Sequence, residues 1–452
     1  MAGGAGESGP AALCPPGARP STPARARPPR ASRSLARTDG AELGRLRHRR
    51  SPGWGHHPWR LPGIRPGDRH GHRGVGYRRL LACMKVDRII LRFVRIPLKF
   101  EFQNRWQRIR DWTKLIVELR SGDLVGYGEC TAMETPYYSY ETIDTAWWVI
   151  TRWLAEPMLR CQFGHPAEVT EAFRLINGHH EGKAALECAF WDLWSRAGSL
   201  PLYQAVGGQR RPVRSGATVG IQDDLETALR LAGSAVEAGY ERLKIKIKPG
   251  WDRELLAAVR AAFPRVTILG DANGAYGEGD IGWLAGLEKF APIIIEQPFP
   301  AGAWTHFASL QARTCTPICL DESISGLEDL EQMIQLQAGR LVNLKIGRVG
   351  GIRDAIRIHD RCAEAGIPVF VGSKAEMGIG RWVNIALATL DNVRYPSDVP
   401  ASDRYFVSEI VRDPVILSGP GLVEPLPGPG FGTEIDSANL SKYTVRSLSI
   451  PD

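Results

Sequence analysis

Residues 242–273 read RLKIKIKPGWDRELLAAVRAAFPRVTILGDAN and contain one strand–helix–strand unit. Alternating apolar residues in RLKIKI predict a strand, RELLAAVRAAF has the apolar spacing of an amphipathic helix, and VTILGDAN predicts the next strand. Such a unit is typical of a parallel sheet that is covered by its own helices. The first strand ends near Lys246 and the second near Asp271.

The same alternation continues on both sides of this unit. Further strands are predicted at 214–220, 293–298, 317–323, 341–347 and 368–373, with a weaker eighth at 394–398. Helical patterns between them, such as 225–239 and 351–366, end at a glycine that suits a helix C-cap. A closed (β/α)8 barrel and an open doubly wound sheet both fit this α/β pattern, so the polar residues must distinguish them.

Five successive predicted strands each end in an ionisable residue, at intervals of 25, 25, 25 and 24 positions: Lys246, Asp271, Glu296, Asp321 and Lys345. In a (β/α)8 barrel the carboxyl ends of the strands meet at one mouth, whereas an open sheet spreads them along an edge. Charges at five consecutive strand ends need partners or an ion, because an unpaired buried charge is costly. The spacing therefore favours a barrel with a site at its mouth.

The types of these residues indicate the chemistry. Three carboxylates without His or Cys beside them are ligands for Mg²⁺, or Mn²⁺, rather than Zn²⁺. A lysine acts as a base only when its pKa falls below about 10.4, and burial, a like charge or a bound cation lowers it. Lys244 supplies the like charge because it shares a strand face with Lys246, and Asn273 shares that of Asp271. A lysine and a divalent ion together suit removal of the proton α to a carboxylate, through an enediolate.

The motifs around these residues resemble those of the o-succinylbenzoate synthase and N-succinylamino acid racemase family, in the muconate lactonizing branch of the enolase superfamily. The resemblance extends from about Met84 to the C-terminus. It is carried by RLKIKIKPGWD (242–252), GDANGAY (270–276), IEQP (295–298), TPICLDES (316–323), VNLKIGRVGG (342–351) and ASDRYF with LSGPGL (401–406 and 417–422). It implies a (β/α)8-type barrel with an N-terminal α+β capping domain.

The resemblance also implies roles for individual residues. Lys246 would be the general base and Lys244 its electrostatic helper, with Lys345 on the opposite face of the substrate. The three carboxylates would hold Mg²⁺. Arg348 stands in the K-x-G-R position that is associated with racemase-capable members.

The sequence departs from the family pattern in two segments that would border the substrate. The capping loop, usually close to TSFG, reads EFQNRWQRIR at 101–110, and the usual GGMxETG reads GSKAEMG at 372–378. Glu376 is retained, whereas Lys374 is new and would either anchor a second substrate carboxylate or be solvated. Lys374 and Glu376 are candidate substrate contacts, as are Asn273 and Arg348.

Four segments are predicted along the chain. Residues 1–83 would form a disordered Arg-, Pro- and Gly-rich leader, or translated upstream sequence before a true start at Met84. Residues 84–212 would form the capping domain, 213–400 the barrel, and 401–452 a segment that returns to the capping domain. The leader holds 16 Arg, no Lys and four acidic residues, so it carries 16 − 4 = +12 and the remainder 8 − 12 = −4.

The distribution of charge, apolar residues and cysteines argues against some classes of function. The basic charge is confined to the leader, so the folded part is not expected to bind nucleic acid. No apolar run reaches the roughly 18 residues that span a bilayer. Eight cysteines without a C-x-x-C pair favour reduced thiols and a cytoplasmic location. We expect a homo-oligomer that binds a small carboxylate substrate.

Three functions remain open at this point. The first is an o-succinylbenzoate synthase of menaquinone synthesis, which dehydrates a cyclohexadiene carboxylate. The second is an N-succinylamino acid racemase or a related epimerase or lyase. The third, a basic-tailed nucleic-acid binder with an inactive barrel, conflicts with the intact lysines and carboxylates.

Overall fold

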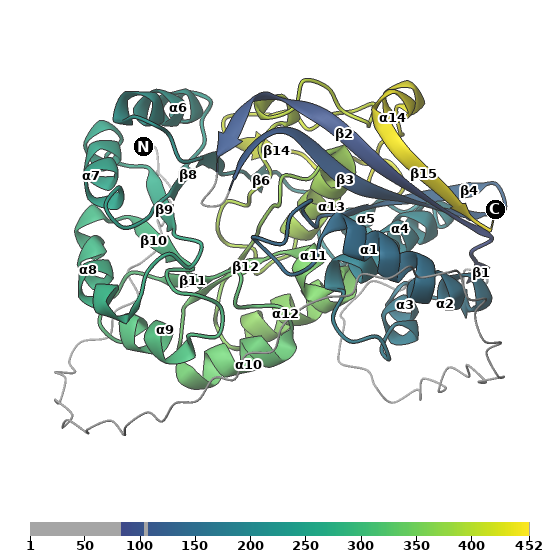
Figure 1. The fold of residues 1–452 in the computed structure, drawn as a ribbon, viewed down its shortest axis with the longest axis horizontal. Coiled ribbons are helices and arrows are strands. Elements are labelled where there is room, and N and C mark those ends of the chain that lie inside the picture. Colours follow the sequence, from purple (N-terminus) through teal and green to yellow (C-terminus); the bar gives the residue numbers. More distant parts are fainter. Residues whose placement is uncertain (1–82, 104–106, 452) are drawn as a thin grey trace, which may run out of the picture. The chain divides into compact units, whose positions relative to one another are not determined.

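The computed structural model describes residues 83–103 and 107–451 of the chain (Figure 1). The predicted leader lies outside these residues, except for Cys83, as does the middle of the predicted capping loop. In the described part, no helix has both the length and the apolar character needed to cross a membrane.

The first part of the described chain is built on an antiparallel sheet with the strand order β15-β2-β3-β4. These strands are β2 (Arg88–Gln103), β3 (Arg108–Ser121), β4 (Leu124–Cys130) and β15 (Thr444–Ile450). β15 is last in the chain, yet it runs beside β2 along most of its length (Figure 1). Two short strands, β1 (Met84–Lys85) and β5 (Gln162–Phe163), pair separately.

Helices cover one face of this sheet. They are α1 (Ile143–Val149), a π-helical turn (Ile150–Leu154), α2 (Ala155–Arg160), α3 (Ala167–Ala172), α4 (His180–Ala197) and α5 (Leu202–Ala205). α4 lies directly on β4, where a Cβ at Gly128 would come within 2.1 Å of the Ala185 carbonyl oxygen. Only glycine permits this approach, which fixes α4 against the sheet.

The second part contains a seven-stranded parallel sheet with the order β13-β12-β11-β10-β9-β8-β7. The strands are β7 (Ala217–Val219), β8 (Arg242–Lys246), β9 (Thr267–Asp271), β10 (Ile293–Glu296), β11 (Ile318–Leu320), β12 (Leu341–Leu344) and β13 (Val369–Val371). The helices are α6 (Leu225–Glu237), α7 (Asp252–Ala262), α8 (Ile281–Ala285), α9 (Trp304–Gln311), α10 (Leu327–Leu336), α11 (Ile346–Val349), α12 (Ile352–Glu364) and α13 (Gly378–Ala388). Three 3₁₀ turns occupy Glu278–Asp280, Gly286–Phe290 and Ser402–Arg404, and β6 (Val213–Arg214), β14 (Leu422–Val423) and α14 (Ser437–Tyr443) complete the elements.

Both faces of the parallel sheet are apolar, but they belong to two separate cores. Residues on one face, such as Ile268 and Ile295, pack into the large core with the helices. Residues on the other face form a small separate core: Leu269, Ile294, Cys319, Leu341 and Phe370, with Tyr395 against them. An inner face that packs on itself is the arrangement of an α/β barrel. In Figure 1, α7 to α10 accordingly follow an arc outside β9 to β12.

The predicted eighth strand at 394–398 does not form a regular strand, which corrects that expectation. Pro396 interrupts the segment, and proline has no N–H to donate to a ladder. The flanking residues nevertheless bond to both edges of the sheet. Asp398 N donates to Val371 O at 2.8 Å, and Ser397 N donates to Arg214 O at 2.9 Å.

The predicted first strand, 214–220, is also divided. It appears as β6 and β7, with Ser215 and Gly216 between them. A Cβ at Gly216 would lie 2.2 Å from the Arg242 guanidinium, so the chain leaves room there for a buried arginine.

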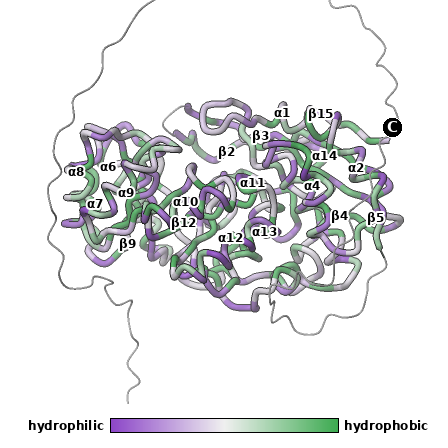
Figure 2. Tube along the Cα trace, turned by 90° about the horizontal axis from the view of Figure 1, so that it is seen from below, coloured by the Kyte–Doolittle hydropathy of each residue, from purple (hydrophilic) through white to green (hydrophobic). Residues whose placement is uncertain are grey.

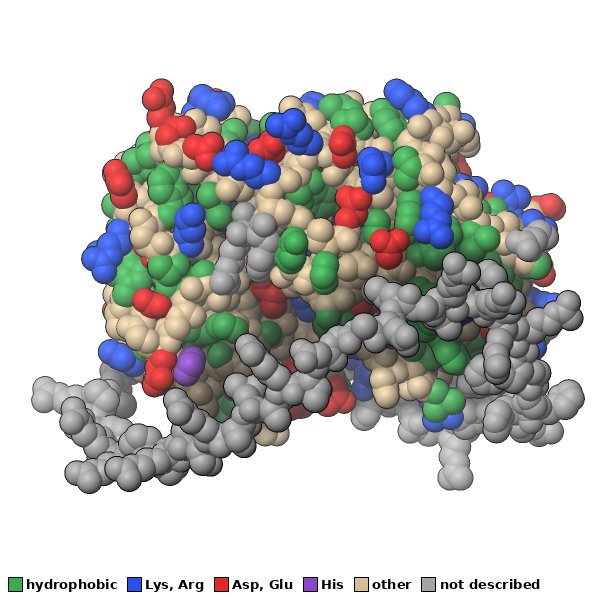
Figure 3. Space-filling view, viewed as in Figure 1, with side chains coloured by type: hydrophobic (Ala, Val, Ile, Leu, Met, Phe, Trp, Pro, Cys, Tyr) green, Lys and Arg blue, Asp and Glu red, His purple; other side chains and the backbone are tan. Residues whose placement is uncertain are grey.

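The covering helices are amphipathic, and the face drawn in Figure 3 carries charges of both signs. The tube in Figure 2 alternates between hydrophobic and hydrophilic segments along α6 to α9, as amphipathic covering helices should. On the face drawn in Figure 3, acidic and basic side chains are interspersed. Six described cysteines have free thiols (Cys83, Cys130, Cys161, Cys188, Cys319 and Cys362).

Candidate active site

The five strand-end charges lie on the inner face of the curled sheet, one layer above its small apolar core. Glu296 follows the inward Ile294 by two positions, and Asp271 follows Leu269 in the same way. Alternate residues of a strand point to the same side, so the period that builds the core also places the charges. These side chains are therefore neighbours at one mouth of the sheet.

The two lysines of β8 each bind carboxylates of neighbouring strands. Lys246 donates from Nζ to Asp271 Oδ2 and to Asn273 Oδ1, both at 2.6 Å. Lys244 donates to Glu296 Oε1 at 3.0 Å and lies 2.8 Å from Asp398 Oδ2. The N-terminal half of the barrel mouth is thus a network of alternating charges.

Lys345 forms the second cationic group of the mouth. Its Nζ donates to Asp321 Oδ2 at 2.9 Å and to the Tyr138 hydroxyl at 2.8 Å. Arg348, three residues further along, donates to the other Asp321 oxygen and to the same hydroxyl. Tyr138 comes from the loop that follows β4, so a residue of the N-terminal part completes this group.

The surrounding charges determine which carboxyl groups ionise. Burial raises the pKa of Asp271, but Lys246 and Lys244 outweigh it and hold that pKa below its ordinary value. Burial acts on Asp321 in the same way, yet Arg348 and Lys345 keep its pKa well below the usual range. Both groups are therefore carboxylates at neutral pH.

The pKa of Glu296 shifts in the opposite direction, because the nearby lysine does not outweigh burial and the neighbouring carboxylates. Burial and the charge of Asp271 raise the pKa of Glu296 to about 8, despite the neighbouring Lys244. Burial disfavours the charged form of Lys244, but Asp398 and Glu296 raise its pKa well above the ordinary value. Lys244, Lys246, Lys345 and Arg348 thus balance the charge of Asp271, Glu296 and Asp321, but one oxygen of Glu296 remains without a hydrogen-bond partner.

The residues present fit a divalent metal ion in their chemistry. Asp271, Glu296 and Asp321 offer only carboxylate oxygens, which are hard ligands. Glu296 Oε2 is buried without a hydrogen-bond partner, and an ion would satisfy it. Within the described residues, however, no three acidic, His or Cys side chains are spaced to share one ion. Each carboxylate is instead drawn to a lysine or arginine of its own.

Comparisons with known proteins agree with this geometry. The family model "Enolase C-terminal domain-like" matches residues 227–439. An o-succinylbenzoate synthase of Geobacillus kaustophilus is 39% identical over 80% of this chain and 96% of its own length. An N-succinylamino acid racemase of an Amycolatopsis species is 40% identical over 81% of this chain and 100% of its own. A solved structure, an enolase superfamily member from Listeria innocua, has a TM-score of 0.78 at 34% identity and covers 81% of this chain and 99% of that one.

The chain belongs to the enolase superfamily. Its family is that of the o-succinylbenzoate synthases and N-succinylamino acid racemases, which confirms the resemblance drawn from the motifs. As a member of the enolase superfamily it is an enzyme.

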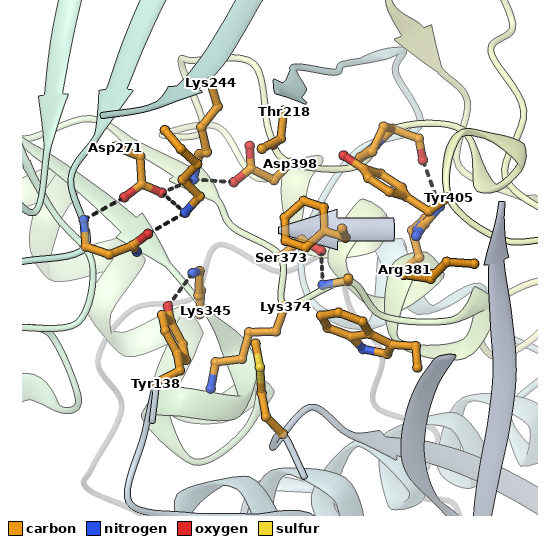
Figure 4. Close-up of a pocket in the computed structure, with 18 residues that line it drawn as sticks. Tyr138, Thr218, Lys244, Asp271, Lys345, Ser373, Lys374, Arg381, Asp398 and Tyr405 are labelled. Atoms are coloured by element: carbon orange, nitrogen blue, oxygen red, sulfur yellow. Dashed lines mark hydrogen bonds and ion pairs between the residues drawn. The ribbon is translucent and has the colours of Figure 1, made fainter. Parts of the chain in front are cut away.

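A cavity with about 860 Å³ of empty space opens at this mouth of the enolase-superfamily fold. Lys244, Lys246, Asp271, Asn273 and Lys345 line one end of it. The lining also includes apolar and aromatic groups and one arginine: Leu98, Phe102, Trp112, Met133, Pro400, Tyr405 and Arg381. In Figure 4, Asp271 and Lys244 accordingly lie at the opposite side of the cavity from Tyr405 and Arg381.

The four candidate substrate contacts are placed differently. Asn273 lines the cavity and donates to Glu322, so it links Lys246 to a second carboxyl group. Lys374 also lines the cavity but is buried and ion-paired with Glu181 of α4, so the expectation of a solvated lysine is wrong. Neither Arg348 nor Glu376 is among the residues that line the cavity.

Glu376 shapes the loop between β13 and α13. Its carboxylate accepts hydrogen bonds from the Ser373 hydroxyl and from Lys374 N, the latter at 2.8 Å. Ala375, inside this loop, has a φ of 55°, a conformation that non-glycine residues adopt rarely. Glu376 therefore holds a strained loop that borders the cavity.

Sequence reasoning missed three residues of the site: Tyr138, Asp398 and Arg381. Asp398 ends the interrupted eighth segment, so the rule that found the other strand-end charges would have identified it. Tyr138 and Arg381 carry no such signal, because a loop and a helix bring them to the cavity.

Proposed function

We propose that this enzyme removes the proton α to a substrate carboxylate in an Mg²⁺-dependent reaction, and that it is an o-succinylbenzoate synthase of menaquinone synthesis. One observation carries the proposal: lysines of β8 and of the end of β12 line the same cavity, next to three buried carboxylates. The relatives named o-succinylbenzoate synthase support the choice of substrate.

Lys246 is the proposed base. Its Nζ lies within hydrogen-bond reach of Asp271 and Asn273, which fix the side chain at the cavity wall. In the dehydration, Lys246 takes the α proton, and the substrate becomes an enediolate. The carbon–oxygen bond at the neighbouring carbon then breaks, and the same lysine returns the proton to the departing hydroxide, which leaves as water.

Lys345 and Lys244 provide positive charge during this step. Lys345 remains an ammonium beside Asp321 and neutralises the developing negative charge of the substrate. Lys244, held by Glu296 and Asp398, supplies a fixed like charge near Lys246.

Asp271, Glu296 and Asp321 are the proposed Mg²⁺ ligands. The bound ion would stabilise negative charge on the substrate carboxylate and so lower the barrier to losing the α proton. The ion would also bind the Glu296 oxygen that has no hydrogen-bond partner.

The N-terminal part is proposed to act as a cap over a (β/α)8-type barrel. The proposed boundaries are 84–212 for the cap, 213–400 for the barrel and 401–452 for the returning segment. Pairing of β15 with β2 supports the return, and hydrogen bonds from Ser397 and Asp398 to both sheet edges support barrel closure.

Racemisation of N-succinylamino acids is the second candidate. Lys246 and Lys345 both line the cavity, which suits proton removal on one side of the α carbon and return on the other. The Amycolatopsis relative at 40% identity bears the name N-succinylamino acid racemase.

The test uses the full chain with Mg²⁺ and two substrates. Dehydration of the cyclohexadiene carboxylate is followed by absorbance, and exchange at the α carbon of an N-succinylamino acid is followed by proton NMR in D₂O. Dehydration supports the synthase. Exchange without dehydration refutes the synthase and leaves the racemase, whereas the absence of both refutes the proposal.

A further inference from the structure

Arg381 and Tyr405 lie on the side of the cavity away from Asp271 and Lys244 (Figure 4). Among the described residues, the cavity wall carries five cationic side chains (Lys244, Lys246, Lys345, Lys374 and Arg381) and two acidic ones (Asp271 and Asp398). Four of the cations have a carboxylate partner nearby. The ion pairs are Lys244 with Glu296, Lys246 with Asp271, Lys345 with Asp321, and Lys374 with Glu181.

Arg381, on α13, is the exception among the described residues that line this cavity. Its side chain is buried, with 2% of the residue exposed. Nη2 donates to the Glu376 carbonyl oxygen at 2.8 Å, and Nη1 donates to the Pro400 carbonyl oxygen at 3.1 Å and to Ser402 Oγ at 3.5 Å. All these acceptors are neutral, and the buried Nε has no hydrogen-bond partner.

A buried guanidinium without a counter-ion is costly, because charge loses its hydration on burial. Backbone carbonyl dipoles offset part of that cost. They also fix the guanidinium in place, and a fixed, poorly solvated cation binds an incoming anion strongly. Arg381 is therefore prepared to bind a negative charge that the described residues around it do not supply.

We propose that Arg381 is a specificity-determining residue that recognises a second anionic group of the substrate, a carboxylate at the far end from the reacting one. The succinyl substrates of the proposed function are dicarboxylates, and Arg381 would bind the acid group that does not react, across an apolar segment. Phe102, Trp112 and Tyr405 would contact that segment from the walls of the cavity. This inference rests on the proposed function, and the terminal carboxylate of a succinyl group meets the requirement.

Lys374 is the competing candidate for this role. It lines the cavity, but its ammonium is paired with Glu181, which also accepts from the Thr131 hydroxyl at 2.5 Å. A second carboxylate at Lys374 would have to compete with Glu181. The unpaired charge of Arg381 makes it the better anion anchor.

The experiment compares two substrates on the full chain with Mg²⁺. One is an N-succinylamino acid, and the other is the N-butanoyl derivative, in which a methyl group replaces the terminal carboxylate. Rates of α-proton exchange in D₂O give kcat and KM for wild type, Arg381→Met and Arg381→Lys. Arg404→Met is the matched control, because Arg404 stacks on Tyr240 and does not line the cavity.

We expect wild type to have at least a tenfold lower KM for the succinyl compound. Arg381→Met should remove this preference by raising KM for that substrate alone, Arg381→Lys should retain part of it, and Arg404→Met should leave it unchanged. Equal KM values in wild type, or an equal loss for both substrates in Arg381→Met, would overturn the assignment. If Arg381→Met does not fold, equal KM values in wild type still overturn the assignment, and Arg381→Lys supplies the comparison that is specific to this residue.

Binding distinguishes failure of this inference from failure of the proposed function. If neither substrate exchanges its proton, calorimetric titration of both compounds into wild type and Arg381→Lys replaces the kinetics. Tighter, Arg381-dependent binding of the succinyl compound would support the anchor while the proposed reaction fails. Equal binding, or none, would refute the anchor.

Discussion

Replacing Asp398 by Asn tests whether a missed carboxylate holds the cationic side of the site together. Asp398 Oδ1 accepts from Arg242 Nη2 at 2.5 Å, and Oδ2 lies 2.8 Å from Lys244 Nζ. Arg242 is fully buried, and its Nε and Nη1 have no hydrogen-bond partners. Each carboxylate oxygen thus serves one buried cation, whereas an amide offers a single oxygen and turns its NH₂ group toward the other cation.

The expected loss of folding stability follows from the buried cation that is left without its counter-ion. Removing one partner of a buried ion pair costs about 3–5 kcal/mol, because the other charge stays buried without compensation. For a folded unit of roughly 370 residues, this lowers Tm by about 4–6 °C. Thermal unfolding of the full-length Asp398→Asn variant, followed by circular dichroism, measures this shift. The loss of an anchor for Lys244 should also lower kcat/KM at least tenfold.

The double variant Arg242→Met/Asp398→Asn shows how much of the loss of stability is due to the uncompensated charge of Arg242. With the guanidinium removed as well, the cost of the stranded charge disappears. The double variant should therefore be more stable than the sum of the two single changes, by at least ~1 kcal/mol. A Tm of Asp398→Asn within 1 °C of wild type, or strict additivity, would refute the reasoning.

Four further predictions concern the reaction and the stability of the fold. Lys246→Met should slow α-proton exchange by about 10³-fold while substrate binding in calorimetry changes little, and a preserved rate would exclude it as the base. Glu296→Gln should abolish the rise in Tm that Mg²⁺ causes in wild type; an unchanged rise would exclude Glu296 as a ligand. Burial raises the pKa of Glu187 to about 7, so its stabilising contribution is complete below its ordinary pKa and is lost as pH rises through 7. The fall of Tm between pH 5 and 8 should accordingly be shallower in Glu187→Gln, and identical slopes would contradict this. Lys374→Met should lower stability by about 3–5 kcal/mol, because it leaves Glu181 buried and unpaired. Adding Glu181→Gln should recover part of the loss, and no recovery would show that the pair is not its cause.

Much of the site follows from local periodicity. Lys244 and Lys246 share the inner face of β8, and Asp271 lies on the inner face of the adjacent β9. A strand repeats every two residues and a strand–helix unit about every 25 here, so both periods are visible in the chain before it folds. The same rule extends to Asp398, but prolines at 396 and 400 obscure the strand pattern that precedes it.

The partners of these charges are not visible in the same way. Lys374 contacts Glu181, 193 residues away, and Tyr138 contacts Lys345, 207 residues away. Neither contact follows from a regular spacing of residues along the sequence, because each depends on how α4 and the loop after β4 pack against the mouth of the sheet.

The sequence by itself determined the α/β alternation, the family and the row of charges along one face of the strands, because these depend on backbone geometry within a single repeat. Tertiary structure alone decided which charge is compensated. It paired Lys374 with Glu181 and left Arg381 buried among neutral groups. The physical reason is that the free energy of a buried charge depends on whether an opposite charge lies within a few ångströms, and only the folded chain fixes that distance.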